Sequence, residues 1–120
     1  VFNNSTLGMV KLEMLVNGLP DFQTDVPDTN YAEIARAIGF HAERVEDASR
    51  LEDAYREAFA APGPALIEVI TDPNALSLPP AITGGQVVGF ATAMSKIVLN
   101  RGIAEAFSMA TSNMRNIPRL

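Results

Sequence analysis

The sequence predicts an α/β fold built on a parallel sheet and followed by a helical tail. Residues 65–71 are almost continuously apolar and β-branched, which is typical of a parallel strand covered on both faces. Apolar residues recur at spacings of three and four over residues 31–38 and 51–59, which predicts a helix in each stretch. Strands that alternate with helices along the chain define the α/β class.

The first part of the chain is predicted to contain a strand end, a helix and a loop. Residues 1–4 pass from apolar to polar, as at the end of a strand. Residues 7–15 have approximately helical spacing, and a Gly-Leu-Pro sequence stops the helix soon afterwards. Residues 21–27 show no periodicity, which predicts a loop.

Two capping boxes mark the starts of the next helices. Asn30 with Glu33 and Ser49 with Glu52 each place a capping side chain three residues before a glutamate. A glycine ends the first of these helices, and residues 40–45 between the two helices are predicted to form a strand.

The rest of the chain divides into a linker and a tail. Residues 73–84 are rich in proline and are predicted to be an extended linker. Residues 85–120 show helical spacing that is interrupted at Gly102, which predicts two helices. We therefore expect a folded part over residues 1–72, the linker, and a helical tail.

The composition excludes several classes of protein. The 120 residues include no cysteine, which excludes a disulfide scaffold, a thiolate zinc site and a cysteine nucleophile. No signal-peptide pattern or long apolar run occurs, so we expect a cytoplasmic protein. The net charge of -5 argues against nucleic acid as a partner, because binding to phosphate backbones needs clustered Lys and Arg.

The start of the chain has the chemistry of a site for a metal-bound phosphate. Asn3 and Asn4 follow the predicted strand, and Gly8 lies where the next helix begins. Helix amino termini attract phosphate because their N–H groups are unpaired, and asparagine and carbonyl oxygens are hard ligands suited to Mg²⁺. Paired asparagines also occur in ordinary turns, so the residues alone leave both interpretations open.

The run Phe-Asn-Asn-Ser-x-Leu-Gly-x-Val-x-x-Glu-Met, residues 2–14, resembles the second half of the thiamine-diphosphate (ThDP) binding motif of enzymes that decarboxylate pyruvate. The resemblance implies that the Asn4 side chain and the Thr6 carbonyl bind the metal. It implies a cofactor-lining segment made of Asn4, Ser5, Thr6, Leu7, Gly8, Met9 and Val10. The other half of the motif, a Gly-Asp-Gly, is expected upstream, so we expect residues 1–72 to be the C-terminal half of a ThDP-binding domain.

The resemblance covers essentially the whole chain and is strongest to the quinone-linked pyruvate dehydrogenases, also called pyruvate oxidases. It continues through residues 28–35, the strand ending at residue 71, the Leu-Pro-Pro at residues 78–80, and Gly89-Phe90. It implies an enzyme that uses ThDP, Mg²⁺ and FAD. Such an enzyme decarboxylates pyruvate to acetate and CO₂ and passes electrons through FAD to quinone.

The same resemblance implies that much of the enzyme lies outside this chain. In the family, FAD binds a middle domain, and the glutamate that activates ThDP comes from a partner subunit of a homo-oligomer. We therefore expect the 120 residues alone to have no turnover. Acetolactate synthases are the alternative relatives, although they typically have a Gln-Trp pair where this chain has Lys11-Leu12-Glu13-Met14.

Three other side chains have a candidate chemical role. Met9 stands where quinone-linked pyruvate oxidases tend to have an aromatic residue, and Glu13 matches a carboxylate that the family places near the cofactor, so both are candidate catalytic residues. Glu13 on an exposed helix face is the alternative. Glu68 interrupts an apolar strand, and it is expected to be a perturbed acid, to lie at a sheet edge or to pair with an arginine.

The tail differs from the rest of the chain in charge. Residues 1–83 carry five basic and thirteen acidic side chains, whereas residues 84–120 carry four basic and one acidic. Cationic amphipathic helices bind anionic membrane surfaces, and the resemblance implies the same for the tail, at the inner face of the cell membrane. Docking onto the rest of the enzyme is the alternative, and a non-catalytic interaction or membrane module is a third interpretation of the chain.

Overall fold

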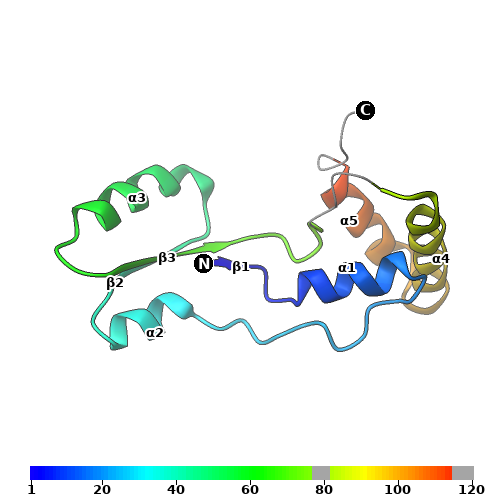
Figure 1. Ribbon diagram of the computed structural model, residues 1–120, viewed down its shortest axis with the longest axis horizontal. Coiled ribbons are helices and arrows are strands. Elements are labelled where there is room, and N and C mark those ends of the chain that lie inside the picture. Colours follow the sequence, from blue (N-terminus) through cyan, green and yellow to red (C-terminus); the bar gives the residue numbers. More distant parts are fainter. Residues whose placement is uncertain (77–81, 115–120) are drawn as a thin grey trace. The chain divides into compact units, whose positions relative to one another are not determined.

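The computed structural model describes residues 1–76 and 82–114 (Figure 1). Contacts group the chain into two compact units. Unit 1 contains residues 1–5 and 27–71, and unit 2 contains residues 6–26 and the described residues from 72 onward. The middle of the predicted linker, including the Leu-Pro-Pro of the resemblance, lies outside the described residues, and the division into residues 1–72, 73–84 and 85–120 stays a prediction.

Unit 1 is built on a three-stranded parallel sheet, as the sequence predicts. Its strands are β1 (Phe2–Asn3), β2 (His41–Val45) and β3 (Ala65–Ile70), in the order β1-β3-β2. Asn3 is in register with Ile70, and Arg44 is in register with Glu68. The central position of β3 places Glu68 in the interior of the sheet rather than at its edge.

Helices cover the two faces of this sheet, with α2 (Tyr31–Ala37) on one side and α3 (Leu51–Ala60) on the other (Figure 1). The α2 side contains a small core of buried alanines, Ala32, Ala35 and Ala42, against which Phe40 and Leu66 pack. Among the described residues of β3, however, only Glu68 is fully buried. The expectation that this strand is covered on both faces is therefore met only in part.

The predicted cap at Asn30 is confirmed, whereas the capping box predicted at Ser49 is wrong. The Asn30 side chain accepts a hydrogen bond from the Glu33 amide at 2.9 Å. Before α3, the side chain of Asp47 accepts from the Ser49 amide at 2.9 Å, and a 3-10 turn over Ala48–Arg50 leads into the helix. Because that tighter turn displaces the start of α3 to Leu51, Ser49 does not act as its cap.

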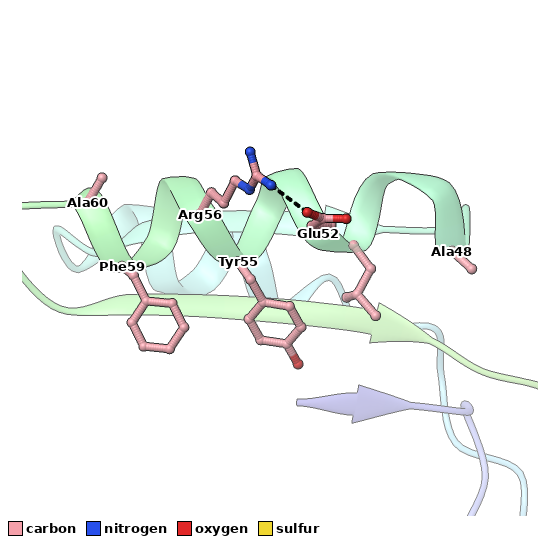
Figure 2. A pocket seen from close by; sticks show the side chains of 7 residues that line it. Ala48, Glu52, Tyr55, Arg56, Phe59 and Ala60 are labelled. Carbon is pink, nitrogen blue, oxygen red and sulfur yellow. Dashed lines mark hydrogen bonds and ion pairs between the residues drawn. The ribbon is translucent and has the colours of Figure 1, made fainter.

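The exposed side of α3 carries an aromatic pair over a shallow hollow (Figure 2). The rings of Tyr55 and Phe59 stack with centroids 6.4 Å apart, and Phe59 remains 88% exposed. An ion pair between Arg56 and Glu52 lies beside them on the same helix. The predicted apolar stripe of residues 51–59 therefore exists, but the described residues bury only part of it.

Unit 2 packs three helices, α1 (Gly8–Val16), α4 (Gly84–Arg101) and α5 (Ile103–Asn113). The buried residues of its core are Leu12, Leu15, Leu76, Ala93, Ile97 and Met109. Gly102, at a φ of +96°, separates α4 from α5 as predicted, because glycine enters this left-handed region without steric cost. A capping box that the sequence analysis missed, Thr83 with Gln86, begins α4.

The contact between α1 and α4 requires a glycine at position 89. A Cβ atom built on Gly89 would lie 1.8 Å from the carbonyl oxygen of Val16. The two backbones therefore approach too closely for any side chain, and this explains the glycine of the Gly89-Phe90 sequence in terms of packing.

Candidate functional site

In unit 1, the predicted metal-binding segment begins in a turn that the buried side chain of Asn3 organises. Asn3 Nδ2 donates to the Thr29 carbonyl at 3.0 Å and to Glu68 Oε1 at 2.6 Å. Its Oδ1 accepts from the Ser5 amide at 3.1 Å. Ser5 has a φ of 49°, an uncommon conformation for a residue other than glycine, and such conformations concentrate at functional sites.

Glu68 is fully buried and has several hydrogen-bond donors around it. Besides Asn3, it accepts from the Ala32 amide at 3.0 Å and lies 3.5 Å from Arg44 Nη1. Burial alone would raise the pKa of the Glu68 carboxyl, but the hydrogen bonds from Ala32 and Asn3 and the positive charge of Arg44 lower that pKa below its ordinary value. Glu68 is therefore a buried anion, and its predicted pairing with an arginine is confirmed.

Arg44 and Asp28 complete a ring of polar contacts in unit 1. Arg44 Nη2 lies 2.9 Å from both carboxylate oxygens of Asp28, and the Ser5 hydroxyl lies 3.5 Å from Asp28 Oδ1. The hydrogen bond to Asp28 is the main reason why the pKa of Arg44 is raised. The ring runs from Glu68 through Asn3, Ser5, Asp28 and Arg44 back to Glu68, and Asn4 lies within the turn that it fixes.

In unit 2, the segment continues into the start of α1. The buried Thr6 donates its hydroxyl to the Thr24 carbonyl at 3.1 Å, and the Leu7 amide donates to the same carbonyl at 2.8 Å. Leu7 is the N-cap residue of α1, and the described residues provide neither a side-chain cap nor an acidic residue in the first turn. The first amides of a helix have no partner within it, so this helix start can accept an anion.

The predicted site residues differ in exposure. Asn4, Ser5 and Gly8 are half-buried and Thr6 is buried, whereas Leu7, Met9 and Val10 are exposed. Met9 is 69% exposed, and Glu13 lies on an exposed part of α1. The catalytic roles of Met9 and Glu13 stay predictions.

The sequence analysis missed a buried lysine in α1. Lys11 Nζ lies 3.1 Å from Asn74 Oδ1 and 3.8 Å from Asp21 Oδ2, and the Lys11 side chain is 6% exposed. Lysine is rarely buried, so composition gave no reason to expect it. The position of Lys11 in the sequence does indicate burial, because Lys11 lies on the same side of the helix as the apolar Leu12 and Leu15.

The donor atoms fit a magnesium diphosphate in part. Asn4 offers an amide oxygen and Thr6 a backbone carbonyl, which are the oxygen ligands that Mg²⁺ accepts together with water and phosphate. Among residues 1–76 and 82–114, no group of three His, Cys, Asp or Glu side chains could hold a metal ion. The remaining ligands would therefore come from the diphosphate, from water or from another part of the protein.

Comparison with known proteins agrees with the predicted resemblance to ThDP-binding enzymes. Residues 1–69 match the family model described as "Thiamine pyrophosphate enzyme, C-terminal TPP binding domain". The chain is 34% identical over 96 residues to "Putative thiamine pyrophosphate-containing protein YdaP" of Bacillus subtilis (strain 168), an alignment that covers 80% of this chain and 17% of that protein. It is 44% identical over 48 residues to "Acetolactate synthase large subunit IlvG" of Mycobacterium tuberculosis (strain ATCC 25618 / H37Rv), covering 40% of this chain and 9% of that protein.

The matched residues include β1, β2, all but the last residue of β3, the Asn4–Val10 segment and α1. The fold and this segment define a cofactor-binding domain of the α/β class. The chain belongs to the thiamine pyrophosphate enzyme family, and its residues 1–69 match the C-terminal TPP-binding domain of that family. It spans less than a fifth of the length of the relatives that it matches.

Proposed function

We propose that this chain forms the metal- and diphosphate-binding part of a ThDP- and Mg²⁺-dependent enzyme that decarboxylates pyruvate, of the quinone-linked pyruvate oxidase type. The observation that carries the proposal is the Asn3-Asn4-Ser5 turn, which leads into the uncapped start of α1 within the residues that match the family model. Thiamine diphosphate, when bound, supplies a carbanion-stabilising centre for decarboxylation of a 2-keto acid.

In this proposal each residue of the segment has a defined task. The Asn4 side-chain oxygen and the Thr6 carbonyl bind Mg²⁺. The first amides of α1, those of Gly8, Met9 and Val10, donate to the diphosphate. Ser5 and Leu7 line the cofactor, and Met9 and Glu13 face the approach to its reactive end.

The oxidase is proposed over a carboligase because of the residues that follow this segment. The segment Lys11-Leu12-Glu13-Met14 stands where acetolactate synthases typically have a Gln-Trp pair, and it begins with Lys11 and Leu12. Both side chains are buried, Lys11 in its contacts with Asp21 and Asn74 and Leu12 in the apolar core. The second candidate function is acetolactate synthesis, which the 44% identity to the mycobacterial enzyme favours.

The proposed reaction also needs an FAD site and an activating glutamate, which we assign to other parts of the enzyme. FAD would bind another region of the enzyme and pass electrons to quinone, and the activating glutamate would come from a partner subunit of a homo-oligomer. We therefore expect the 120 residues alone to produce no acetate from pyruvate.

The tail gives only limited support to membrane binding. Of its four cations, Lys96 donates to the Gly18 carbonyl at 2.9 Å, and Arg101 pairs with Asp21 and Glu105. The other two cations, Arg115 and Arg119, lie outside the described residues. In the part of the chain that the structure describes, no helix is long and apolar enough to cross a membrane. Docking onto the rest of the enzyme accounts better for the described cations.

The exposed apolar side chains of α4 and α5 support the surface-binding alternative. Leu99, Ile103 and Phe107 are 83%, 74% and 67% exposed. Vesicle sedimentation distinguishes the interpretations. A peripheral membrane protein would sediment with anionic vesicles and be released by salt, whereas a docking surface would give no preference for anionic over neutral vesicles.

Product analysis of the protein in its full natural length tests the proposed reaction. Pyruvate, ThDP, Mg²⁺, FAD and a soluble quinone are supplied together. The proposal predicts acetate and reduced quinone. Acetolactate without quinone reduction would replace the oxidase by the second candidate function, and failure to consume pyruvate would contradict both.

A further inference from the structure

We propose that Glu68 is a positioning residue for the Mg²⁺-binding turn and that it acts through Asn3, an inference that rests on the proposed function. Glu68 lies on the central strand β3, and its direct connection to the turn is the 2.6 Å hydrogen bond from Asn3 Nδ2. Glu68 itself is not part of the predicted metal-binding segment. Its effect on the metal would therefore be indirect.

The contacts of Asn3 allow only one orientation of its amide. Glu68 Oε1 and the Thr29 carbonyl are acceptors, so both must face the Nδ2 group. The Ser5 amide is a donor, so it must face Oδ1. A buried amide that has three partners in this arrangement cannot rotate without losing all of them.

The orientation of Asn3 fixes the backbone around Asn4. Ser5 has its left-handed φ of 49° while its amide donates to Asn3 Oδ1, and a polar side chain two residues earlier commonly stabilises such a turn. Asn4 lies between these two residues in the chain. The direction in which its side chain leaves the backbone therefore depends on the hydrogen bond between Asn3 and Ser5.

A carboxylate is the group that these surroundings require at position 68. Its two oxygens face donors from Asn3, Ala32 and Arg44. A glutamine has one oxygen and one NH₂ group, so its NH₂ would face another donor whichever way it turned. Glu68→Gln keeps the shape of the side chain but should release either Asn3 or the amino end of α2.

The affinity for Mg²⁺ reports the effect of Glu68 on the metal-binding turn and does not depend on catalytic turnover. Calorimetric titration of Mg²⁺ into the full natural-length protein with saturating ThDP is the experiment. Groups that orient metal ligands typically change metal affinity by about 10- to 100-fold when altered, and we expect a loss in this range for E68Q. The control is E43Q, because Glu43 lies on the neighbouring strand β2 and pairs with Arg50 rather than Asn3.

A double-mutant cycle separates positioning from general damage. If Glu68 acts through Asn3, then E68Q in an N3A background should cost little further Mg²⁺ affinity. Additive losses, or an E68Q affinity equal to that of E43Q, would overturn the proposal. If circular dichroism shows that E68Q is unfolded, E68D replaces it in the same cycle, because the shorter carboxylate keeps the charge but cannot reach both Asn3 and Ala32.

The outcome for the unaltered protein separates this inference from the proposed function. Absence of Mg²⁺-dependent ThDP binding in the unaltered protein would overturn the proposed function and this inference together. Normal binding with an unchanged E68Q affinity would overturn the role of Glu68 alone.

Discussion

Lys11 and Asp21 form an ion pair in the interior of unit 2, with Nζ 3.8 Å from Oδ2 and both side chains 6% exposed. Asp21 also binds Arg101 of α4, 3.1 Å from its Oδ1 and 2.8 Å from its carbonyl oxygen. One acidic residue thus connects the loop after α1 to two helices. Three residues further on, the Thr24 carbonyl accepts from Thr6 and Leu7, so the same loop supports the start of the proposed cofactor segment.

The first prediction concerns this acidic residue. Asp21→Asn should lower the free energy of unfolding by about 3 kcal/mol, because it removes the carboxylate that pairs with the buried Lys11 cation and with Arg101. Urea unfolding of the 120-residue chain provides the measurement. Asp53→Asn removes an exposed pair with Arg50 and one charge in the first turn of α3, so it is the matched exposed control and should cost less than about 1 kcal/mol. Equal effects of the two substitutions would contradict a structural role for the buried pair.

The second prediction concerns the contact between α1 and α4. Gly89→Ala should lower the free energy of unfolding by about 1–3 kcal/mol, because its Cβ would overlap the Val16 carbonyl and force the helices apart. Gly85→Ala in the same helix is the control. A Cβ at Gly85 meets nothing within 4 Å, so the higher helix propensity of alanine should leave stability unchanged or slightly increased. A tolerated Gly89→Ala would show that the helices are not in close contact.

The third prediction concerns acid sensitivity. The pKa of Glu68 is lowered in the folded chain, so its stabilising contribution is present above its ordinary value of 4.5 and is lost as the pH falls through the lowered pKa. Urea unfolding between pH 7 and pH 3 should therefore show falling stability. Glu68→Gln should make that decline shallower but not abolish it, because a hydrogen bond from the Ser49 amide also lowers the pKa of Asp47. An identical pH dependence in Glu68→Gln would contradict a buried, ionised Glu68.

Much of the fold could be predicted from the sequence because its signals are local. The apolar run of residues 65–71 predicts a parallel strand, and the structure has β3 there. Asn30 and Gly102 mark a helix start and a helix break, because capping and left-handed backbone geometry depend on single residues. Ser49 failed as a cap because Asp47, two residues earlier, competes for the same turn.

The arrangement around the candidate site could not be predicted in the same way. The contacts of Glu68 with Asn3 and Arg44 join residues 65 and 24 positions apart, and no sequence spacing encodes such distances. The burial of Lys11 depends on Asp21 and Asn74, which become neighbours only after the helices pack. The left-handed conformation of Ser5 depends in turn on the Asn3 side chain. The motif therefore predicts a metal-binding segment but not the residues that hold its turn in place.

The central claim is that the segment beginning at Asn4 binds a magnesium diphosphate, and ThDP binding with and without Mg²⁺ tests it most directly. Equilibrium dialysis of the full natural-length protein should show Mg²⁺-dependent ThDP binding, and Asn4→Ala should weaken it by at least about tenfold through loss of a metal ligand. Asn17→Ala, an exposed asparagine at the end of α1, should bind as the unaltered protein does. Binding that does not require Mg²⁺, or that Asn4→Ala leaves unchanged, would contradict the assignment.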